Sequence, residues 1–239
     1  MKTYEKNNIT DIFIISRSNK RAFEQCFNVV SNKGAHGSIL FVYGPSPSGK
    51  TQLLKTTAKQ YLDEYGERPC EVTFNQLIND LVAEIKNEET SNFFEKYSSA
   101  KLLLIDDVQH MLEFPAIQKI LAETLADIAE HGVNVIFFSG YKLSDLADFF
   151  GVLQDKKICV LKSRLYKADM ILRRKLLENI LSGHKTSLTK REFRYIVTNR
   201  KIEISAFNGC ISKLVLTKLL ETDKNKFIDT IGLLKEYER

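Results

Sequence analysis

The sequence has few cysteines and histidines, and their spacing matches neither a metal site nor a redox motif. The cysteines lie too far apart to form a CxxC pair, which excludes zinc ribbons and dithiol redox motifs. The histidines also lack the spacing of metal ligands. We therefore expect reduced thiols and no metal site at these residues: Cys26, Cys70, Cys159, Cys210, His36, His110, His131 and His184.

Long apolar runs are also missing. No stretch approaches 18 consecutive apolar residues, which excludes a transmembrane helix of ordinary length. The first residues, MKTYEKNNITD, lack the apolar core of a signal peptide. We therefore expect a cytoplasmic protein with no membrane partner.

The net charge is modest. The 239 residues carry a formal charge of +5, which permits an anionic partner without requiring one. The positive charge is concentrated between residues 173 and 201, where nine Lys or Arg residues accompany two Glu. Two interpretations stay open for this stretch. It is either a solvated helix surface or an anion-binding face made of Arg173, Arg174, Lys175, Lys190, Arg191 and Arg194.

The sequence does contain an alternation of short apolar runs with helical patterns. This alternation is typical of a parallel sheet covered by helices on both faces. We expect strands at 38–43, 70–74, 101–105, 133–139 and 157–161, with helices at 51–65, 75–85, 117–131 and 142–150. From residue 163 the strand signal stops, and helices are expected at 168–181, 189–198 and 204–220. The sequence thus predicts an α/β domain over residues 1–162 and a small all-helical domain with a short tail over residues 163–239.

The strongest motif is the stretch FVYGPSPSGKTQLL, which has the GxxxxGKT spacing of a phosphate-binding loop. Such a loop follows a buried strand and points its backbone N–H groups at phosphates, while its lysine meets the outer phosphates and its threonine binds Mg2+. The predicted nucleotide contacts are Gly44, Ser48, Gly49, Lys50, Thr51 and Gln52. This loop also contains Pro45 and Pro47, and proline has no N–H to donate.

A second motif, KLLLIDDVQH, ends an apolar strand in two aspartates. Asp106 is placed to bind Mg2+ together with Thr51. Asp107 is then the predicted catalytic residue, because its carboxylate could polarise an attacking water. The alternative is an acidic pair that only terminates a strand, and the phosphate-loop motif earlier in the chain makes that alternative weaker.

Three longer stretches resemble one family of proteins. FFEKYSSAKLLLIDDVQHM, IISRSNKRAF and ILRRKLL are similar to segments of the AAA+ ATPases, and within them of the central domain of the bacterial replication initiators, DnaA. The resemblance implies a P-loop AAA+ fold with a helical lid, ATP or ADP with Mg2+, and assembly on origin DNA. It also implies that Ile14 and Ile15 flank the adenine. The partners that it implies are a DnaA-type initiator or another replication protein, with single-stranded DNA as a further candidate.

Several positions depart from the family pattern. Pro47 stands where the family usually has a glycine whose N–H reaches the bridging phosphate oxygen. After the fourth strand the family places a polar residue that reads the γ-phosphate, and here Gly140 follows Ser139, which could partly substitute. Ser205 stands at the position of the lid arginine, and no arginine lies between residues 140 and 163, where a finger for a neighbouring subunit is implied. These departures predict weak or absent ATP hydrolysis.

Three functions stay open. The first is a DnaA-like accessory or regulator of replication initiation that binds nucleotide. The second is a helicase-loader-like ATPase that binds single-stranded DNA, and the third is an interaction module with a vestigial loop that binds no nucleotide. Duplex origin recognition is not expected, because the 19 residues after Leu220 are too few for a helix-turn-helix domain.

Overall fold

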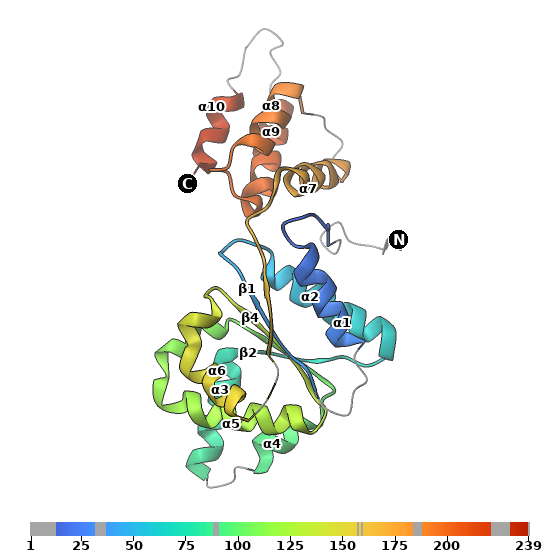
Figure 1. The fold of residues 1–239 in the computed structure, drawn as a ribbon. Coiled ribbons are helices and arrows are strands. Elements are labelled where there is room, and N and C mark those ends of the chain that lie inside the picture. The colour runs from blue at the N-terminus through green and yellow to red at the C-terminus, as the bar shows by residue number, and fades with distance from the viewer. Residues whose placement is uncertain are drawn as a thin grey trace. The chain divides into compact units, whose positions relative to one another are not determined.

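The computed structural model describes residues 13–31, 37–87, 91–156, 158, 160–183, 188–220 and 230–238. They form two compact units (Figure 1). An α/β unit spans residues 19–167, and a helical unit combines residues 168–239 with the segment that ends at Ser18. The division therefore falls after residue 167, whereas the sequence placed it at residue 162 and grouped the first residues with the α/β domain.

A five-stranded parallel sheet with the order β2-β3-β4-β1-β5 forms the centre of the α/β unit. The inner strands β1 (Ile39–Tyr43), β3 (Leu102–Asp106) and β4 (Asn134–Ser139) are almost entirely buried, which explains their continuous apolar sequences. The outer strands are β2 (Cys70–Thr73) and β5 (Val160–Arg164). Because every pairing is parallel, the carboxyl ends of all five strands meet at one edge of the sheet.

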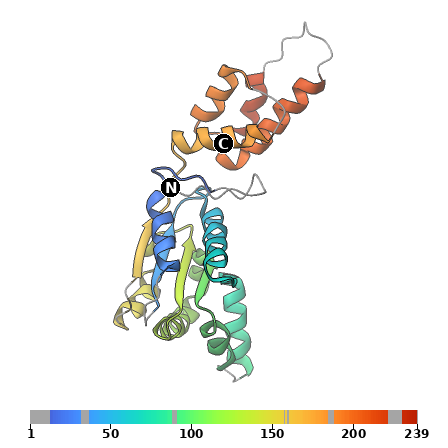
Figure 2. The same cartoon turned by 90° about the vertical axis from the view of Figure 1, so that its right-hand side faces the viewer.

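Helices cover both faces of this sheet, as Figures 1 and 2 show. One face carries α1 (Lys20–Val30) and α2 (Lys50–Tyr65). The other carries α3 (Phe74–Asn87), α4 (Ser91–Ser98), α5 (Pro115–Glu130) and α6 (Ala147–Asp155), with the 3-10 turns η1 (Val108–Glu113) and η2 (Leu143–Leu146). Phe137, Phe149 and Phe150 pack edge to face in the core beneath them. The predicted parallel sheet flanked by helices is confirmed, although the sequence missed α1 and α4.

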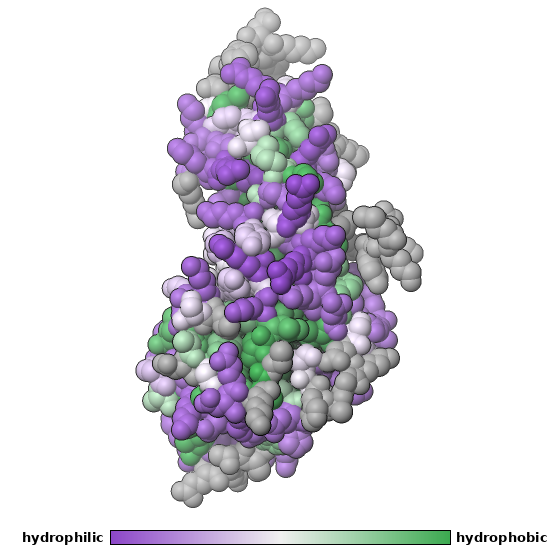
Figure 3. Space-filling view, in the orientation of Figure 1, coloured by the Kyte–Doolittle hydropathy of each residue, from purple (hydrophilic) through white to green (hydrophobic). Residues whose placement is uncertain are grey.

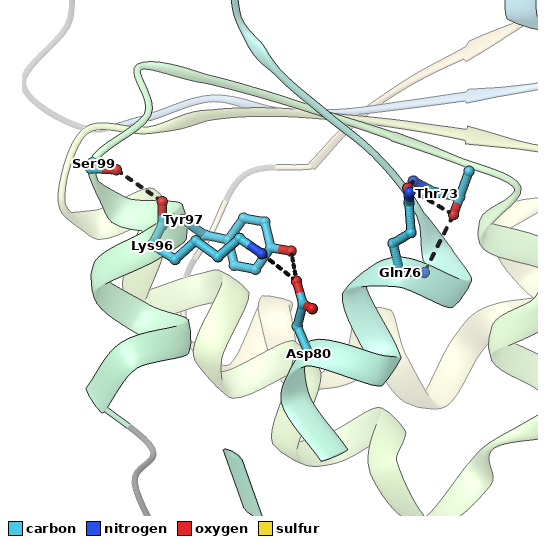
Figure 4. Close-up of polar contacts among 6 residues, drawn as sticks. All are labelled: Thr73, Gln76, Asp80, Lys96, Tyr97 and Ser99. Atoms are coloured by element: carbon cyan, nitrogen blue, oxygen red, sulfur yellow. Dashed lines mark hydrogen bonds and ion pairs between the residues drawn. The ribbon is translucent and has the colours of Figure 1, made fainter. Parts of the chain in front are cut away.

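A small polar cluster fastens α4 to α3 (Figure 4). Thr73 and Gln76 cap the start of α3, since Thr73 N–H donates to Gln76 Oε1 at 2.9 Å and Gln76 N–H donates to Thr73 Oγ1 at 3.3 Å. One turn further, Asp80 Oδ2 accepts hydrogen bonds at 2.6 Å from Lys96 Nζ and from the Tyr97 hydroxyl. Tyr97 is fully buried, and its burial together with the bond to Asp80 raises the pKa of its phenol. The two helices are therefore held in one arrangement beside the sheet.

The last strand lies later in the chain than the sequence predicts. It spans Val160–Arg164 rather than 157–161, and residues 157 and 159 lie outside the described residues. Leu161, Lys162 and Arg164 are exposed along β5, which ends the sheet on one side. An edge strand tolerates charged side chains, so it needs no continuous apolar run. The strand therefore runs three residues past its predicted end at residue 161, and the predicted domain boundary near residue 162 falls inside β5.

The helical unit consists of α7 (Met170–Ser182), α8 (Lys190–Thr198), α9 (Phe207–Leu220) and α10 (Thr230–Leu234), with the turns η3 (Ile204–Ala206) and η4 (Lys235–Tyr237). The chain after α9 packs back onto the earlier helices. Leu234 is fully buried in their core, and the Tyr237 ring lies 3.1 Å from the point where a Cβ on Gly209 would be. Glu238 accepts hydrogen bonds from the Tyr195 hydroxyl and, at 2.7 Å, from Asn199 Nδ2.

Arg173 is a buried structural residue of this unit, so its predicted place in an anion-binding face is wrong. Its guanidinium donates four hydrogen bonds of 2.7–2.8 Å to the carbonyls of Ile196, Val197, Asn199 and Ile202. It also lies 4.8 Å from the centre of the Phe207 ring. The other basic residues predicted for that face are exposed, and hydrophilic residues dominate the side of the helical unit seen in Figure 3.

The segment before residue 19 is joined to the start of α7. Asp169 caps this helix by accepting a hydrogen bond from Leu172 N–H at 2.8 Å, and its second oxygen accepts one from Ser18 N–H at 3.1 Å. Burial alone would raise the pKa of Asp169, but these and other hydrogen bonds hold it below its ordinary value. One carboxylate thus ties the N-terminal segment to the helical unit.

Two features are absent from the described part of the chain, and its cysteines are free thiols. No helix there is both long enough and apolar enough to cross a bilayer. No group of three or more His, Cys, Asp or Glu residues there could hold a metal ion. Cys26, Cys70 and Cys210 are free thiols, while Cys159 lies outside the described residues.

Candidate functional site

The phosphate-loop motif forms a turn between β1 and α2, as its sequence predicts. Gly49 immediately precedes α2 and has φ of 89°, a left-handed conformation that favours glycine. Gly44 is buried, and a Cβ on it would lie 2.5 Å from the Leu165 carbonyl oxygen and 2.9 Å from Ser48 Oγ. Its N–H donates to the Ser139 carbonyl at 3.1 Å, which ties the loop to the end of β4. Only glycine fits at the first position of the motif.

Lys50 lies folded over this loop. Its Nζ donates to the carbonyl oxygens of Gly44 at 2.9 Å and Pro45 at 3.4 Å. Burial lowers the pKa of Lys50, while the nearby carboxylates of Asp106 and Asp107 act in the opposite direction. The Lys50 ammonium is therefore held at the loop by two carbonyl oxygens. The oxygens of a bound phosphate could take their place as hydrogen-bond acceptors.

Thr51 and Asp106 meet across the loop. Thr51 Oγ1 donates to Asp106 Oδ2 at 3.2 Å, and Asp106 Oδ1 accepts the N–H of Asp107 at 2.9 Å. Burial raises the pKa of Asp106, the charge of Asp107 adds to this effect, and the hydrogen bonds oppose it. A hydroxyl and a carboxylate are oxygen ligands of the kind that Mg2+ prefers. The predicted pair is thus brought together in a way that fits Mg2+ beside the loop.

The hydroxyl of Ser48 also fits a phosphate ligand. Ser48 is 6% exposed, and its Oγ has no hydrogen-bond partner among the described residues. A buried hydroxyl without a partner is unfavourable and is satisfied when an acceptor binds. Gln52, also predicted to contact nucleotide, lies half-buried in the first turn of α2. The loop residues present therefore fit a nucleotide with its metal.

Asp107 is exposed and leaves β3 in the left-handed region, with φ of 57°. Its Oδ1 accepts a hydrogen bond at 2.8 Å from Gln109 Nε2. The same amide accepts a hydrogen bond at 2.8 Å through its Oε1 from the N–H of Gly140, which follows β4. Gln109 was missed by the sequence analysis, because only the fold shows that the ends of β3 and β4 are neighbours.

The remaining predicted residues have different positions. Ser139 is fully buried, and its Oγ accepts a hydrogen bond from Tyr141 N–H at 3.1 Å. Ile14 is half-buried and Ile15 is 40% exposed, and both belong to the helical unit. Ser205 is exposed in that unit and donates to Glu203 at 3.4 Å. The roles given to these four residues stay predictions.

The exposed Arg164 lies at the carboxyl end of β5, on the side of the sheet where the phosphate loop begins, and was missed by the sequence analysis. Arg164 pairs in register with Tyr43, the residue before Gly44, and its guanidinium lies 4.9 Å from the centre of the Tyr166 ring. The interval without arginine, residues 140–163, ends one residue before it. Extending the expected strand to residue 164 instead of 161 would have included it.

The chain resembles known proteins over most of its length. The family model described as the bacterial DnaA ATPase domain matches residues 4–157. The chromosomal replication initiator protein DnaA of Thermotoga petrophila is 25% identical over 227 residues, which cover 94% of this chain and 51% of that protein. This chain therefore spans about half the length of that relative.

Solved structures show the same fold. Domain III of the Thermotoga maritima replication initiation protein DnaA matches with a TM-score of 0.75 and 24% identity, covering 97% of this chain and 96% of that one. The replication initiator DnaA bound to AMPPCP and single-stranded DNA matches with a TM-score of 0.70 and 22% identity, covering 94% of this chain and 66% of that one. These structures show the AAA+ fold, and the family match over residues 4–157 shows that this chain belongs to the family of bacterial DnaA ATPase domains.

Proposed function

We propose that this protein binds ATP or ADP with Mg2+ and acts in the cytoplasm as a DnaA-like accessory or regulator of replication initiation. The observation that carries the proposal is the convergence of Lys50 and Thr51, at the start of α2, with Asp106, at the end of β3. Thr51 and Asp106 are 3.2 Å apart, and Lys50 lies on the loop with carbonyl partners that a phosphate could replace. Family membership supports the adenine nucleotide.

Each residue has a place in this proposal. The loop N–H groups from Ser48 to Thr51 and the ammonium of Lys50 hold the phosphates. Thr51 and Asp106 hold Mg2+, which when bound neutralises phosphate charge. Gly44, Gln52 and Ser139 shape the site, and Ile14 and Ile15 contact the adenine.

Hydrolysis is proposed to be weak or absent. In this reaction a water oxygen bonds to the γ-phosphorus, the bond to the bridging oxygen breaks, and ADP, phosphate and a proton leave. Asp107 is the residue proposed to orient the water. Pro47 lacks the N–H that would meet the bridging oxygen, and Gly140 and Ser205 offer no charged side chain to the reacting phosphate.

The proposed partners are a DnaA-type initiator or another replication protein, and single-stranded DNA. The solved DnaA complex with AMPPCP and single-stranded DNA supports both nucleotide and DNA as ligands. Arg164, exposed at the loop edge of the sheet, is the residue that we propose to reach a nucleotide held by a neighbouring subunit.

Titration with a fluorescent ATP analogue, with and without Mg2+, tests nucleotide binding. We expect saturable binding that Lys50→Ala weakens at least tenfold, which is roughly the loss of one charge-assisted contact. Lys55→Ala removes an exposed lysine of the same helix and serves as the matched control. No saturable binding by the unmodified protein would favour the interaction module with a vestigial loop.

A second measurement tests the partner. We expect the protein to bind a full-length initiator from the same cell in the presence of ATP, and Lys50→Ala to weaken this binding. Equal capture with and without nucleotide would contradict a nucleotide-dependent regulator. Tight, nucleotide-dependent binding to a replicative helicase instead would favour the loader.

A further inference from the structure

Gln109 links the ends of two neighbouring strands through its side chain. Its amide group lies between the carboxylate of Asp107, which follows β3, and the N–H of Gly140, which follows β4. Both contacts are 2.8 Å long, which is a good distance for an N–H···O hydrogen bond. Gln109 is half-buried, while Asp107 and Gly140 are exposed, so the bridge lies at the surface of the carboxyl edge.

Its two partners fix which way this amide points. A carboxylate accepts hydrogen bonds and a backbone N–H donates them, so the NH2 group must face Asp107 and the carbonyl oxygen must face Gly140. The reversed amide would set two donors against each other and two acceptors against each other. One orientation of Gln109 therefore satisfies both neighbours, and it holds Asp107 Oδ1 in a single place.

The amide of Gln109 lies against Gly140. A Cβ on Gly140 would lie 3.6 Å from Gln109 Cδ and 3.6 Å from Gln109 Oε1, which is ordinary contact. The amide of Gln109 thus lies directly beside the point where a side chain at position 140 would begin. The end of β4 therefore does have a polar side chain beside it, but this side chain belongs to Gln109, which follows β3 in the chain.

The phosphate loop is bonded to the same edge. Gly44 N–H donates to the carbonyl of Ser139 at 3.1 Å, and Ser139 precedes Gly140. Asp107 N–H donates to Asp106 Oδ1 at 2.9 Å, so the metal-binding aspartate and the water-orienting aspartate share a backbone contact. Gln109 therefore links Asp107, the residue proposed to orient water, to the end of β4, which is also hydrogen-bonded to the phosphate loop.

We propose that Gln109 is a positioning residue, which fixes the Asp107 carboxylate and supplies at the end of β4 the polar group that Gly140 lacks. This rests on the proposed function, since Asp107 needs a bound ATP to act on. Gln109 touches neither the phosphate loop nor Lys50 in the contacts described, so its removal should affect the hydrolysis step and leave ATP affinity in place. The step is the attack of water on the γ-phosphorus with release of ADP, phosphate and a proton.

Single-turnover hydrolysis with enzyme in excess over ATP tests the assignment, with the ATP dissociation constant measured in parallel. We expect Gln109→Ala to slow hydrolysis about tenfold with an unchanged dissociation constant, because one hydrogen bond to a charged group is lost. Gln109→Glu keeps the shape and the acceptor but replaces the donor by a second carboxylate. It should slow hydrolysis as much as the alanine variant.

Gln118 provides the matched control. Its Nε2 donates to the Met111 carbonyl at 3.0 Å, so Gln118→Ala also loosens η1 but leaves Asp107 alone. We expect this variant to hydrolyse at the unmodified rate. Equal slowing in Gln118→Ala, or an unchanged rate in Gln109→Ala and Gln109→Glu, would overturn the inference.

Two further outcomes separate the inference from the proposed function. Binding of ATP by the unmodified protein with no hydrolysis above the protein-free solution overturns the role of Gln109 and leaves nucleotide binding intact. Loss of ATP affinity in Gln109→Ala by tenfold or more also overturns it, because the residue would then serve binding. Failure of the unmodified protein to bind ATP at all overturns both.

Discussion

Replacing Arg173 tests whether this residue of the basic stretch, residues 173–201, stabilises the helical unit instead of binding an anion. Its guanidinium donates to the carbonyls of Ile196 and Val197, which lie in the last turn of α8. Carbonyls in the last turn have no partner within the helix. A buried acceptor left without a partner costs about 1–3 kcal/mol, so these two carbonyls alone put the cost of Arg173→Ala at about 2–6 kcal/mol.

Hydrogen exchange of the α8 amides, followed by mass spectrometry, measures this cost where it arises. Arg173→Lys should lose about half as much protection, because one ammonium cannot reproduce the planar fork of the guanidinium. Arg174→Ala is the control, since Arg174 forms an exposed i,i+4 pair with Glu178 that is worth a few tenths of a kcal/mol. Protection in Arg173→Ala within about 0.5 kcal/mol of the unmodified protein would refute the structural role, since that margin is ordinary for surface substitutions.

Four more predictions concern other parts of the chain. Leu234→Ala should destabilise the helical unit by about 2–5 kcal/mol in urea unfolding, because a fully buried leucine is truncated. Asp169→Ala should cost about 0.5–2 kcal/mol as a lost cap. The pKa of Asp169 is lower in the folded protein than in the unfolded chain. Its contribution to stability is therefore fully present at pH values above the unfolded pKa and is lost as the pH falls through the folded pKa. A melting temperature that does not change with acid would contradict this. Pro47→Gly should raise single-turnover hydrolysis by up to about a hundredfold through the restored N–H, and an equal or lower rate would argue against the missing donor. Reversing the exposed charges of Arg191 and Arg194 should weaken binding to single-stranded DNA of any sequence and flatten its salt dependence, whereas unchanged binding would leave only a solvated surface.

The parts of the fold that the sequence predicted are those with strong local signals. The buried strands β1, β3 and β4 are continuous apolar runs, and a run of this kind bounded by turn residues indicates a strand without knowledge of its neighbours. The GxxxxGKT spacing defines a loop whose backbone conformation is specified by glycine. The pair of Thr51 and Asp106 follows from these two motifs, because parallel strands bring their carboxyl ends together.

The parts that the sequence missed depend on neighbours distant in the chain. Gln109 has meaning only beside Gly140, and their contact requires β3 and β4 to be adjacent. Arg173 is charged, so the sequence pattern grouped it with its basic neighbours. It lies one helical turn before the buried Leu177 and on the same face of α7. The strand β5 contains Lys162 and Arg164 and no continuous apolar run, which its place at the edge of the sheet explains.

The hydrogen bond from Ser18 to Asp169 joins residues 151 positions apart and gives the helical unit two separate pieces of chain. During synthesis the first piece emerges long before α7, so it has no partner until the whole α/β unit has been made. Closing so long a loop through an unfolded chain carries a large entropy cost, but a folded α/β unit would hold its two ends near each other. Correct folding of residues 19–167 is thus a condition for completing the helical unit. A deletion ending at residue 18 would weaken the helical unit, although it removes residues from the other end of the protein.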